Sequence, residues 1–370
     1  MASVAVVDKA PTGFNYNKYF DFEYDHYHLS SKKVKKLLKR DVDLEFNSDA
    51  YEYVVLIGSE SSKFIGGVGS VTEFAGHLVD EKFIPMINPA ILSFKPDAKP
   101  SFERALEKLH GYIAGEKPPT VTGDFEGIIE EERANEYLES ILNDETIKFV
   151  ACDTETTALY PRDGYVLGIS LTHKNEQGVY ISTECIGERT EELLQNLFTS
   201  KMIVFHNAKF DLKMLEYHFG FHFPRVSDTM LMHYVLDETQ GSHGLKQLAM
   251  KYTNYGDYDK ELDDFKTQYC KDHKVLKGDF TYDLIPFDIM YKYAAIDTAV
   301  TYELYQMFSK KILSSVNLTK VYKDLMLPGM LFLKDVEENG VPFNAERLEK
   351  VQLLMEREIE EAKATLYEYK

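Results

Sequence analysis

The sequence has few cysteines, no long apolar run and no surplus of positive charge. Cys152, Cys185 and Cys270 are its three cysteines. They occur in no paired motif, an odd count typical of a reduced cytoplasmic protein, and we expect them to be structural. No apolar stretch approaches the roughly 18 residues that span a membrane. Met1 is not followed by the charged segment of a secretory signal. These absences argue against a secreted disulfide scaffold and a membrane protein.

Positive charge is scarce relative to negative charge. The chain carries 42 Lys and Arg against 61 Asp and Glu, a formal net charge of −19. Proteins that bind nucleic acid normally present a basic surface, so this balance weakens such a function. Bound divalent cations would offset part of the acidity locally, and acidity alone indicates little beyond solubility. The glycines at 66, 67 and 69 form no Walker or complete dinucleotide motif, and we expect a turn there.

The first 116 residues read as a small α/β accessory domain. Short apolar runs at 4–7, 53–57 and 83–87 predict strands, and 102–113 has the clearest helical pattern. Strands alternating with helices favour a parallel sheet. The basic segment 32–40 predicts a helix capped by Ser30 or Ser31. That helix is interpreted as a solvated face or as a contact to nucleic acid or a partner. The function of this domain stays open.

The remainder divides into three parts. Residues 117–146 have the composition of a linker followed by an acidic helix at 130–142. Residues 147–318 predict an α/β layer domain. Its expected strands are 148–153, 165–172, 178–182 and 202–206, with helices near 191–198, at 209–219 and from 288 onward. Residues 319–370 are helical in pattern, with a break near 340–342.

Two carboxylates follow a buried strand at the start of the layer domain. Asp153 and Glu155 come after the apolar run 149–152. Alternation along a strand places both side chains on one face and Thr154 on the other. The alternative is a solvated strand end, but the preceding run is apolar on both faces. Close carboxylates near a core are costly without a cation, so this pair predicts a metal site.

Two more segments complete an acidic constellation. Asn207 suits a helix N-cap, and Asp211 follows one turn later. Tyr293 and Asp297 are four residues apart on a helix and therefore neighbours on one face. The tyrosine either packs there or positions a water molecule. Four carboxylates and a tyrosine from three elements match what two divalent cations require to hydrolyse a phosphodiester. The constellation predicts a nuclease.

In this order the three segments resemble those of the tyrosine-type, four-carboxylate 3′-5′ proofreading exonucleases, which have a ribonuclease H-like α/β fold. The resemblance implies two Mg²⁺ or Mn²⁺ ions. Asp153, Glu155 and Asp297 would hold one ion, Asp153 would bridge to the second, and Asp211 would support it largely through water. Tyr293 and Glu155 would orient the attacking water. The implied reaction releases nucleoside monophosphates from single-stranded or frayed DNA.

The same resemblance implies substrate contacts. Thr156 and Leu159 stand where this family packs against the terminal base. Phe210 occupies a position often held by tyrosine, which keeps the stacking surface and loses a hydroxyl. Asn207 would contact the 3′-terminal nucleotide.

The last stretch is similar to the opening of a family A DNA polymerase domain. The segments 327–330 and 336–344 carry this similarity. The segments 243–252 and 280–290, with 7–10 and 94–96, resemble the polymerases of T-five-like bacteriophages. This implies a DNA primer-template as substrate and a polymerase domain in cis or in trans. It also implies replisome proteins as candidate partners of the first domain, in the cytoplasm of a bacterial host.

Polymerase signatures themselves are absent from the sequence. We find no Asp-Tyr-Ser type strand, lysine-bearing finger helix or His-Asp-Glu turn. We therefore expect no nucleotide incorporation by this chain alone, whether it is a piece of a longer polymerase or the front half of one encoded in pieces. Two alternatives stay open. One is an RNA-trimming exonuclease of the ribonuclease D type, and the other is an inert exonuclease-like docking module.

Overall fold

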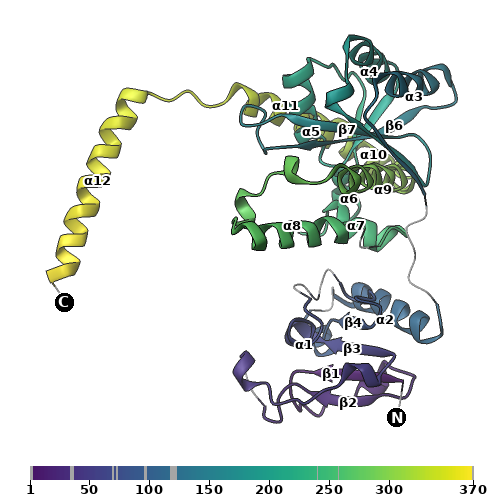
Figure 1. Cartoon of the computed structure of the whole chain (residues 1–370), viewed down its shortest axis with the longest axis vertical. Helices are drawn as coiled ribbons and strands as arrows, with labels where there is room; N and C mark the ends of the chain where they lie inside the picture. Colours follow the sequence, from purple (N-terminus) through teal and green to yellow (C-terminus); the bar gives the residue numbers. More distant parts are fainter. Residues whose placement is uncertain are drawn as a thin grey trace. The chain divides into compact units, whose positions relative to one another are not determined.

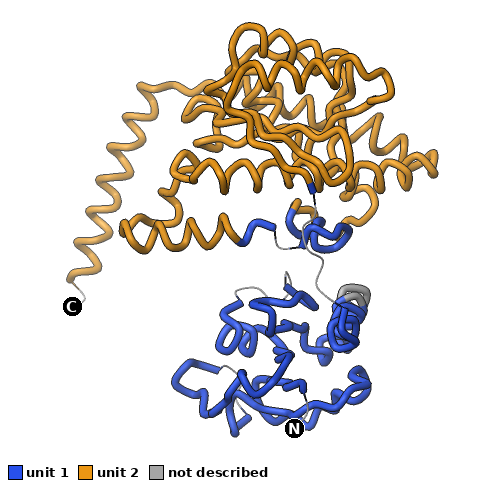
Figure 2. Tube along the Cα trace, turned by 45° about the vertical axis from the view of Figure 1, so that its right-hand side comes forward, with its two compact units in different colours: residues 1–123, 246–260 blue, residues 124–245, 261–370 orange. Residues whose placement is uncertain are grey.

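The computed structural model describes residues 3–33, 37–68, 71, 74–95, 98–116, 123–239, 241–256 and 258–368. The chain forms two compact units (Figure 2). The first comprises 1–123 and 246–260, and the second comprises 124–245 and 261–370. Within the described ranges, no helix has the length and apolar character needed to cross a membrane.

The first unit is built on a parallel sheet in the order β2-β1-β3-β4 (Figure 1). Its elements are β1 (Val4–Asp8), β2 (Asp25–His28), β3 (Tyr53–Ile57), α1 (Gly58–Phe64), β4 (Phe83–Met86) and α2 (Lys99–Ile113). All five residues of β1 are buried, as expected of a central parallel strand covered on both faces. Val4 and Val6 pack in a core with Phe102 of α2, whereas Ala5 and Val7 belong to a separate core on the other face.

The structure confirms the three strands expected in this unit and corrects the basic helix. Residues 31–33 and 37–38 are irregular, and 39–41 form a short 3₁₀ turn; residues 34–36 lie outside the described part. Leu37 is instead buried in the core. Ser31 donates from its backbone N and its Oγ to Asp43, at 2.8 and 2.5 Å, rather than capping a helix. Tertiary burial and this side-chain bond replace the local helical preference.

The second unit holds a mixed sheet in the order β10-β9-β6-β7-β8-β5. Its strands are β5 (Asp124–Ile128), β6 (Phe149–Thr156), β7 (Val166–Thr172), β8 (Gln177–Ser182), β9 (Met202–Phe205) and β10 (Val226–Asp228). Only β7 runs antiparallel to its neighbours in this described sheet. Residues 124–146, expected as linker and acidic helix, contain the edge strand β5 and a helix of this unit.

Helices cover both faces of this sheet (Figure 1). One face packs against α3 (Glu131–Asn143), α4 (Glu188–Ser200) and α5 (Ala208–Phe219) through a single core that includes Val150 and Cys152. The long helix α9 (Phe287–Leu313) crosses the other face, where Tyr302 stacks on Phe149 with ring centroids 4.6 Å apart. This arrangement confirms the expected ribonuclease H-like α/β fold.

The remaining helices follow the sheet in the chain. They are α6 (Thr229–Leu236), α7 (Leu245–Tyr252), α8 (Lys260–His273), α10 (Val316–Lys320), α11 (Leu327–Asn339) and α12 (Ala345–Glu368). A π-helical turn, Val321–Met326, joins α10 to α11. The predicted helical break near 340–342 is present, because α11 ends at Asn339 and α12 begins at Ala345. The described residues of α12 are exposed along its whole length.

Candidate active site

The site begins on β6, the strand in the middle of the sheet. Residues 149, 151, 153 and 155 alternate toward the face that α9 covers, and Phe149 marks that face through its stack on Tyr302. Asp153 and Glu155 therefore point toward α9. The register between β6 and β7 shifts between Glu155 and Thr156. Such an irregularity bends a strand and re-aims the side chains at its end.

Helix α9 brings the next two side chains. Asp297 lies one turn after Tyr293, and it is 5% exposed while Glu155 is 4% exposed. Carboxylate oxygens of Asp153, Glu155 and Asp297 all lie within 4.8 Å of one another. Tyr293 is half-buried and packs against a core cluster that includes Tyr180 and Met290.

Close packing fixes the height of α9 above the sheet. A Cβ on Gly178 of β8 would lie 2.3 Å from the carbonyl oxygen of Ala295. Only a residue without a side chain permits this approach. The hydroxyls of Thr172 and Thr298 are hydrogen-bonded at 2.9 Å, which ties the helix to β7. Ala295 is two residues before Asp297, so these contacts set the position of that carboxylate.

Asp211 reaches the site from the opposite layer. It lies on α5 and is 2% exposed. Its Oδ1 accepts hydrogen bonds from the backbone N of Thr154 at 3.0 Å and from Thr154 Oγ1 at 2.7 Å. Thr154 points away from the α9 face, as the alternation predicts. Asp211 is therefore held beside the strand and lies outside the three-carboxylate cluster.

The carboxylates repel one another electrostatically. Burial, followed by the charges of Asp211, Glu155 and Asp297, raises the pKa of Asp153 well above its usual value. Burial raises the pKa of Asp211 to about 7, although the two hydrogen bonds from Thr154 oppose this shift. A cation among these oxygens would relieve the repulsion. The donors are all carboxylate oxygens, which fit hard divalent ions such as Mg²⁺ and Mn²⁺.

Asp228 is a supporting residue that the sequence analysis missed. Its carboxylate accepts backbone hydrogen bonds from Asn207 at 3.3 Å and Ala208 at 2.8 Å, and it also caps α6. The hydroxyl of Tyr322 bonds to its backbone. Asp228 immediately precedes the apolar helix at 229–236, a pattern that predicts an N-cap. The second role, holding the start of α5, depends on tertiary structure.

Asn207 occupies the N-cap position of α5 but makes no side-chain cap bond, which corrects its expected capping role. Its φ of 67° is left-handed, a conformation that asparagine tolerates better than most residues. Asp228 satisfies the backbone in its place, and the Asn207 side chain is exposed.

The other expected substrate contacts differ in exposure. Leu159 is 76% exposed, whereas Thr156 is 9% exposed and donates from Oγ1 to the carbonyl of Ala158 at 2.9 Å. Phe210 is half-buried against the core that α5 shares with the sheet.

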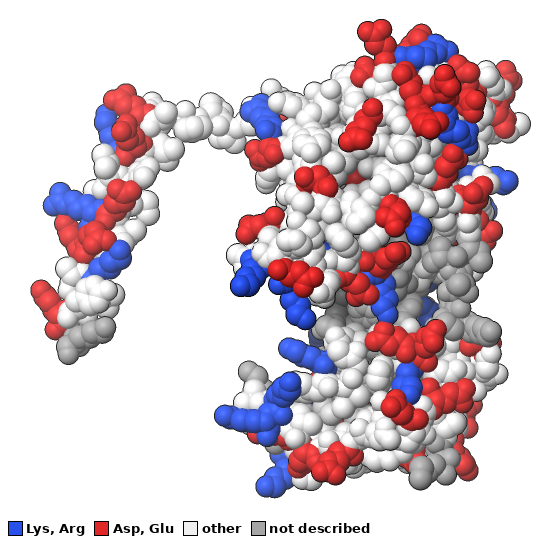
Figure 3. All heavy atoms as spheres, in the orientation of Figure 1, with Lys and Arg blue, Asp and Glu red and all other residues white. Residues whose placement is uncertain are grey.

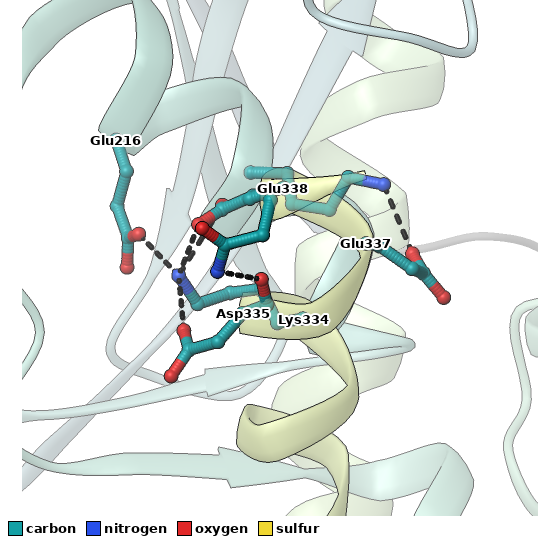
Figure 4. Close-up of polar contacts among 7 residues, drawn as sticks. Glu216, Lys334, Asp335, Glu337 and Glu338 are labelled. Carbon is teal, nitrogen blue, oxygen red and sulfur yellow. Dashed lines mark hydrogen bonds and ion pairs between the residues drawn. The ribbon is translucent and has the colours of Figure 1, made fainter. Parts of the chain in front are cut away.

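Helix α11 holds the solvent side of α5 through ion pairs (Figure 4). Glu337 pairs with Lys209 at 2.5 Å and with Lys213 at 3.1 Å. Lys334 pairs with Glu216 at 2.5 Å, although its side chain is only 8% exposed. The helix that carries Asp211 is thus fixed at its start by Asp228 and along its length by α11.

Comparisons of the sequence with known proteins identify its relatives. A family model described as 3′-5′ exonuclease matches residues 125–313. The DNA polymerase of Escherichia phage T5 is 42% identical over 387 aligned positions, which cover 99% of this chain and 45% of that protein. The DNA polymerase of Bacillus phage SP01 is 26% identical, with 86% of this chain and 37% of that protein covered.

One of the similar solved structures is ribonuclease D of Escherichia coli, an exoribonuclease involved in structured RNA processing. Its TM-score with this chain is 0.44 and its sequence identity is 16%. The match covers 58% of this chain and 51% of that chain. The chain spans less than half the length of the two phage polymerases.

Proposed function

Because the chain belongs to the 3′-5′ exonuclease family, we propose that it removes nucleotides from the 3′ end of DNA as the editing part of a phage replicative polymerase. The similarity to a phage DNA polymerase along 99% of the chain supports DNA as the substrate. The observation that carries the catalytic proposal is the cluster of Asp153, Glu155 and Asp297. The proposed partner is a family A polymerase domain, in cis or in trans, within the cytoplasm of a bacterial host.

The four carboxylates take complementary roles in this proposal. Asp153, Glu155 and Asp297 would hold one divalent ion, Asp153 would share a second, and Asp211 would support that one through water. When bound, the ions favour deprotonation of the attacking water and stabilise negative charge on the leaving oxygen. Glu155 and Tyr293 orient the water toward the terminal phosphorus atom. Mg²⁺ and Mn²⁺ both suit the oxygen donors.

The exposed residues at the end of β6 and the start of α5 would receive the substrate. The half-buried ring of Phe210 and the exposed side chain of Leu159 offer apolar surfaces to unstacked bases, a contact that accepts any base. Thr156 would pack beside the terminal base, and Asn207 would bond to the last nucleotide. An editing site needs this tolerance because any of the four bases can be misincorporated.

Replacement of one metal ligand tests the proposal. Asp153→Asn keeps the shape of the side chain and removes its charge. Loss of even an outer contact to a metal ligand typically costs 10–100-fold, so we expect hydrolysis of a single-stranded DNA oligonucleotide in Mg²⁺ to fall by at least about a hundredfold. Digestion is measured by release of nucleoside monophosphates. An unchanged rate would refute the site assignment.

Matched substrates test the choice of nucleic acid. DNA and RNA oligonucleotides of one sequence are digested in parallel by the unaltered chain and by Asp153→Asn. Faster release from DNA supports editing, whereas faster release from RNA would favour the ribonuclease D type of reaction. Absence of hydrolysis of both substrates by the unaltered chain would favour an inert docking module.

A further inference from the structure

A second cluster of metal-binding side chains lies in the first unit, at the carboxyl end of its parallel sheet. Asp8 ends β1, and His26 and His28 lie on the neighbouring strand β2. The register pairs Val6 with His26 and Asp8 with His28. Alternation along both strands therefore places the three side chains on one face. Their ligand atoms all lie within 4.8 Å of one another.

The carboxylate at the centre of this cluster is fixed by its neighbours. Asp8 Oδ1 lies 2.5 Å from His28 Nδ1, and Oδ2 lies 3.1 Å from His26 Nε2. The hydroxyl of Tyr16, a residue that is 1% exposed, donates to Oδ2 at 3.0 Å. A buried donor behind a carboxylate is the arrangement that commonly orients metal ligands.

The two imidazoles converge on a single carboxylate. Their ring centroids are 4.5 Å apart. If both rings bound Asp8 as imidazolium ions, two positive charges would lie side by side against one negative charge. A divalent cation held by the three lone pairs provides the same attraction without that like-charge contact.

The cluster has a buried floor and an open side. Asp8 is 3% exposed, whereas the side chains of both histidines are 30% exposed. A cavity of about 400 Å³ adjoins them, lined by the three ligands, the segment 11–17 and Tyr24. Three protein ligands with space for a further ligand is the pattern of metal sites that keep one position open.

We propose that Asp8, His26 and His28 bind one divalent transition-metal ion, typified by Zn²⁺, with an open position facing this cavity. Imidazole nitrogens favour Zn²⁺ and related ions, whereas oxygen-only sites favour Mg²⁺ and Mn²⁺. The chain thus has two metal sites of different chemistry, one in each unit. Because its ligands come from β1 and the edge strand β2, the ion also fastens β2 to the sheet.

Zinc binding to the full chain tests this site independently of nuclease activity. Metal-stripped protein is titrated with Zn²⁺ by calorimetry in excess Mg²⁺, which occupies the carboxylate cluster of the second unit. We expect His26→Gln combined with His28→Gln, and separately Asp8→Asn, to weaken Zn²⁺ binding by at least about a hundredfold. His110→Gln is the matched control, since His110 lies in the same unit with its side chain 34% exposed. This control and Asp153→Asn should retain the affinity.

Nuclear magnetic resonance of the imidazole rings locates the ion directly. In the unaltered chain, Zn²⁺ should shift the ring signals of His26 and His28 and leave those of His110 unchanged. This measurement needs no variant, so it decides the matter even if a substitution unfolds the first unit. Equal Zn²⁺ affinity in the unaltered chain and the double histidine variant would overturn the proposal. Unshifted signals of His26 and His28, or loss of Zn²⁺ binding in Asp153→Asn alone, would overturn it as well.

Discussion

In the second unit, some residues form the carboxylate cluster, and others hold the acidic side chains in position. Asp153, Glu155 and Asp297 come together from a strand and a helix, whereas Thr154 retains Asp211 from the other face. Alternation along a strand and helical periodicity are local properties, so the sequence predicted which of these side chains share a face. The sequence patterns of the single segments were ambiguous, and the resemblance to the exonuclease family joined the four carboxylates into one predicted site. Asp228 was missed because its bonds to the start of α5 join residues about twenty positions apart.

The hydroxyl of Tyr293 can be tested separately from its ring. Tyr293→Phe keeps an aromatic ring against the core cluster that includes Tyr180 and removes the hydroxyl that we propose contacts the attacking water. We expect the rate of 3′-terminal hydrolysis to fall by about a hundredfold, in line with the contribution of a positioned proton-transfer or orienting group. The Mg²⁺ concentration for half-maximal rate should not change. Tyr291→Phe on the same helix is the control, and equal rates in the two variants would contradict the role of Tyr293.

His77 makes the first unit sensitive to acid. Its Nε2 lies 3.0 Å from Lys108 Nζ, which donates to it and also to the carbonyl of Met250. Burial, and then the charge of Lys108, lowers the pKa of His77 to about 3. The unfolded chain, with a histidine pKa of about 6.5, therefore binds a proton that the folded chain excludes between these values. Stability must fall as pH decreases through this window.

His77→Gln keeps an acceptor for Lys108 and removes the titration. Between pH 7.5 and 4.5, we expect the free energy of unfolding of this variant to fall by about 1–2 kcal/mol less than that of the unaltered chain. Hydrogen exchange of the β1 and β3 amides reports on the first unit specifically. Identical pH dependences for the two proteins would show that His77 is protonated in the folded state.

Whole elements were predicted unevenly, and the reason is physical. The strands β1, β3, β4, β6, β7, β8 and β9 were expected because their sequences contain the apolar runs that are typical of buried strands. The edge strands β2, β5 and β10 were not expected, since their sequences Asp-His-Tyr-His, Asp-Phe-Glu-Gly-Ile and Val-Ser-Asp are polar or mixed. Their pairing depends on a distant partner rather than on local pattern. The prediction of a basic helix at 32–40 was wrong for a related reason, because the burial of Leu37 is a tertiary effect.

The contact between β8 and α9 gives an element-level prediction. In Gly178→Ala the new Cβ would meet the Ala295 backbone at 2.3 Å from its oxygen, so α9 must move away from the sheet. Overpacking of this kind costs about 1–3 kcal/mol. Asp297 moves with the helix, and we expect nuclease activity to fall further than the loss of folded protein explains.

Gly278→Ala is the matched control for this change. Apart from its own turn and chain neighbours, no heavy atom of the described residues would lie within 4 Å of a Cβ at Gly278, and the φ of this residue is not left-handed. Urea denaturation and nuclease rates are measured for both variants. A Gly178→Ala protein that keeps full stability and rate would show that α9 is not held at this height by the glycine.

At the scale of the whole molecule, charge is the property that accords least with a nucleic-acid substrate. The chain carries −19, and Asp and Glu side chains are dense over α3 and α4 in Figure 3. Part of this acidity is paired, as where Arg189 of α4 bridges Glu139 and Glu192. A surface that is acidic on balance disfavours holding a long stretch of DNA by phosphate contacts. Composition alone could not distinguish this chain from an ordinary acidic protein, whereas the clustered carboxylates support our proposal that the substrate binds at one site.

The salt dependence of DNA binding follows from this distribution. If the chain binds only the last few nucleotides, it neutralises about two to four phosphates. The logarithm of the binding constant for single-stranded DNA should then fall with the logarithm of salt concentration at a slope of about −1.5 to −3. Binding is measured at constant Mg²⁺ with an oligonucleotide whose 3′-terminal linkages are phosphorothioates, which slows hydrolysis.

An oligonucleotide with a blocked 3′ end is the control. It should bind more weakly, because bases cannot enter the site from within the strand. A much steeper slope, with equal binding of the blocked strand, would place the main DNA contact on an extended basic surface instead of at the carboxylate cluster.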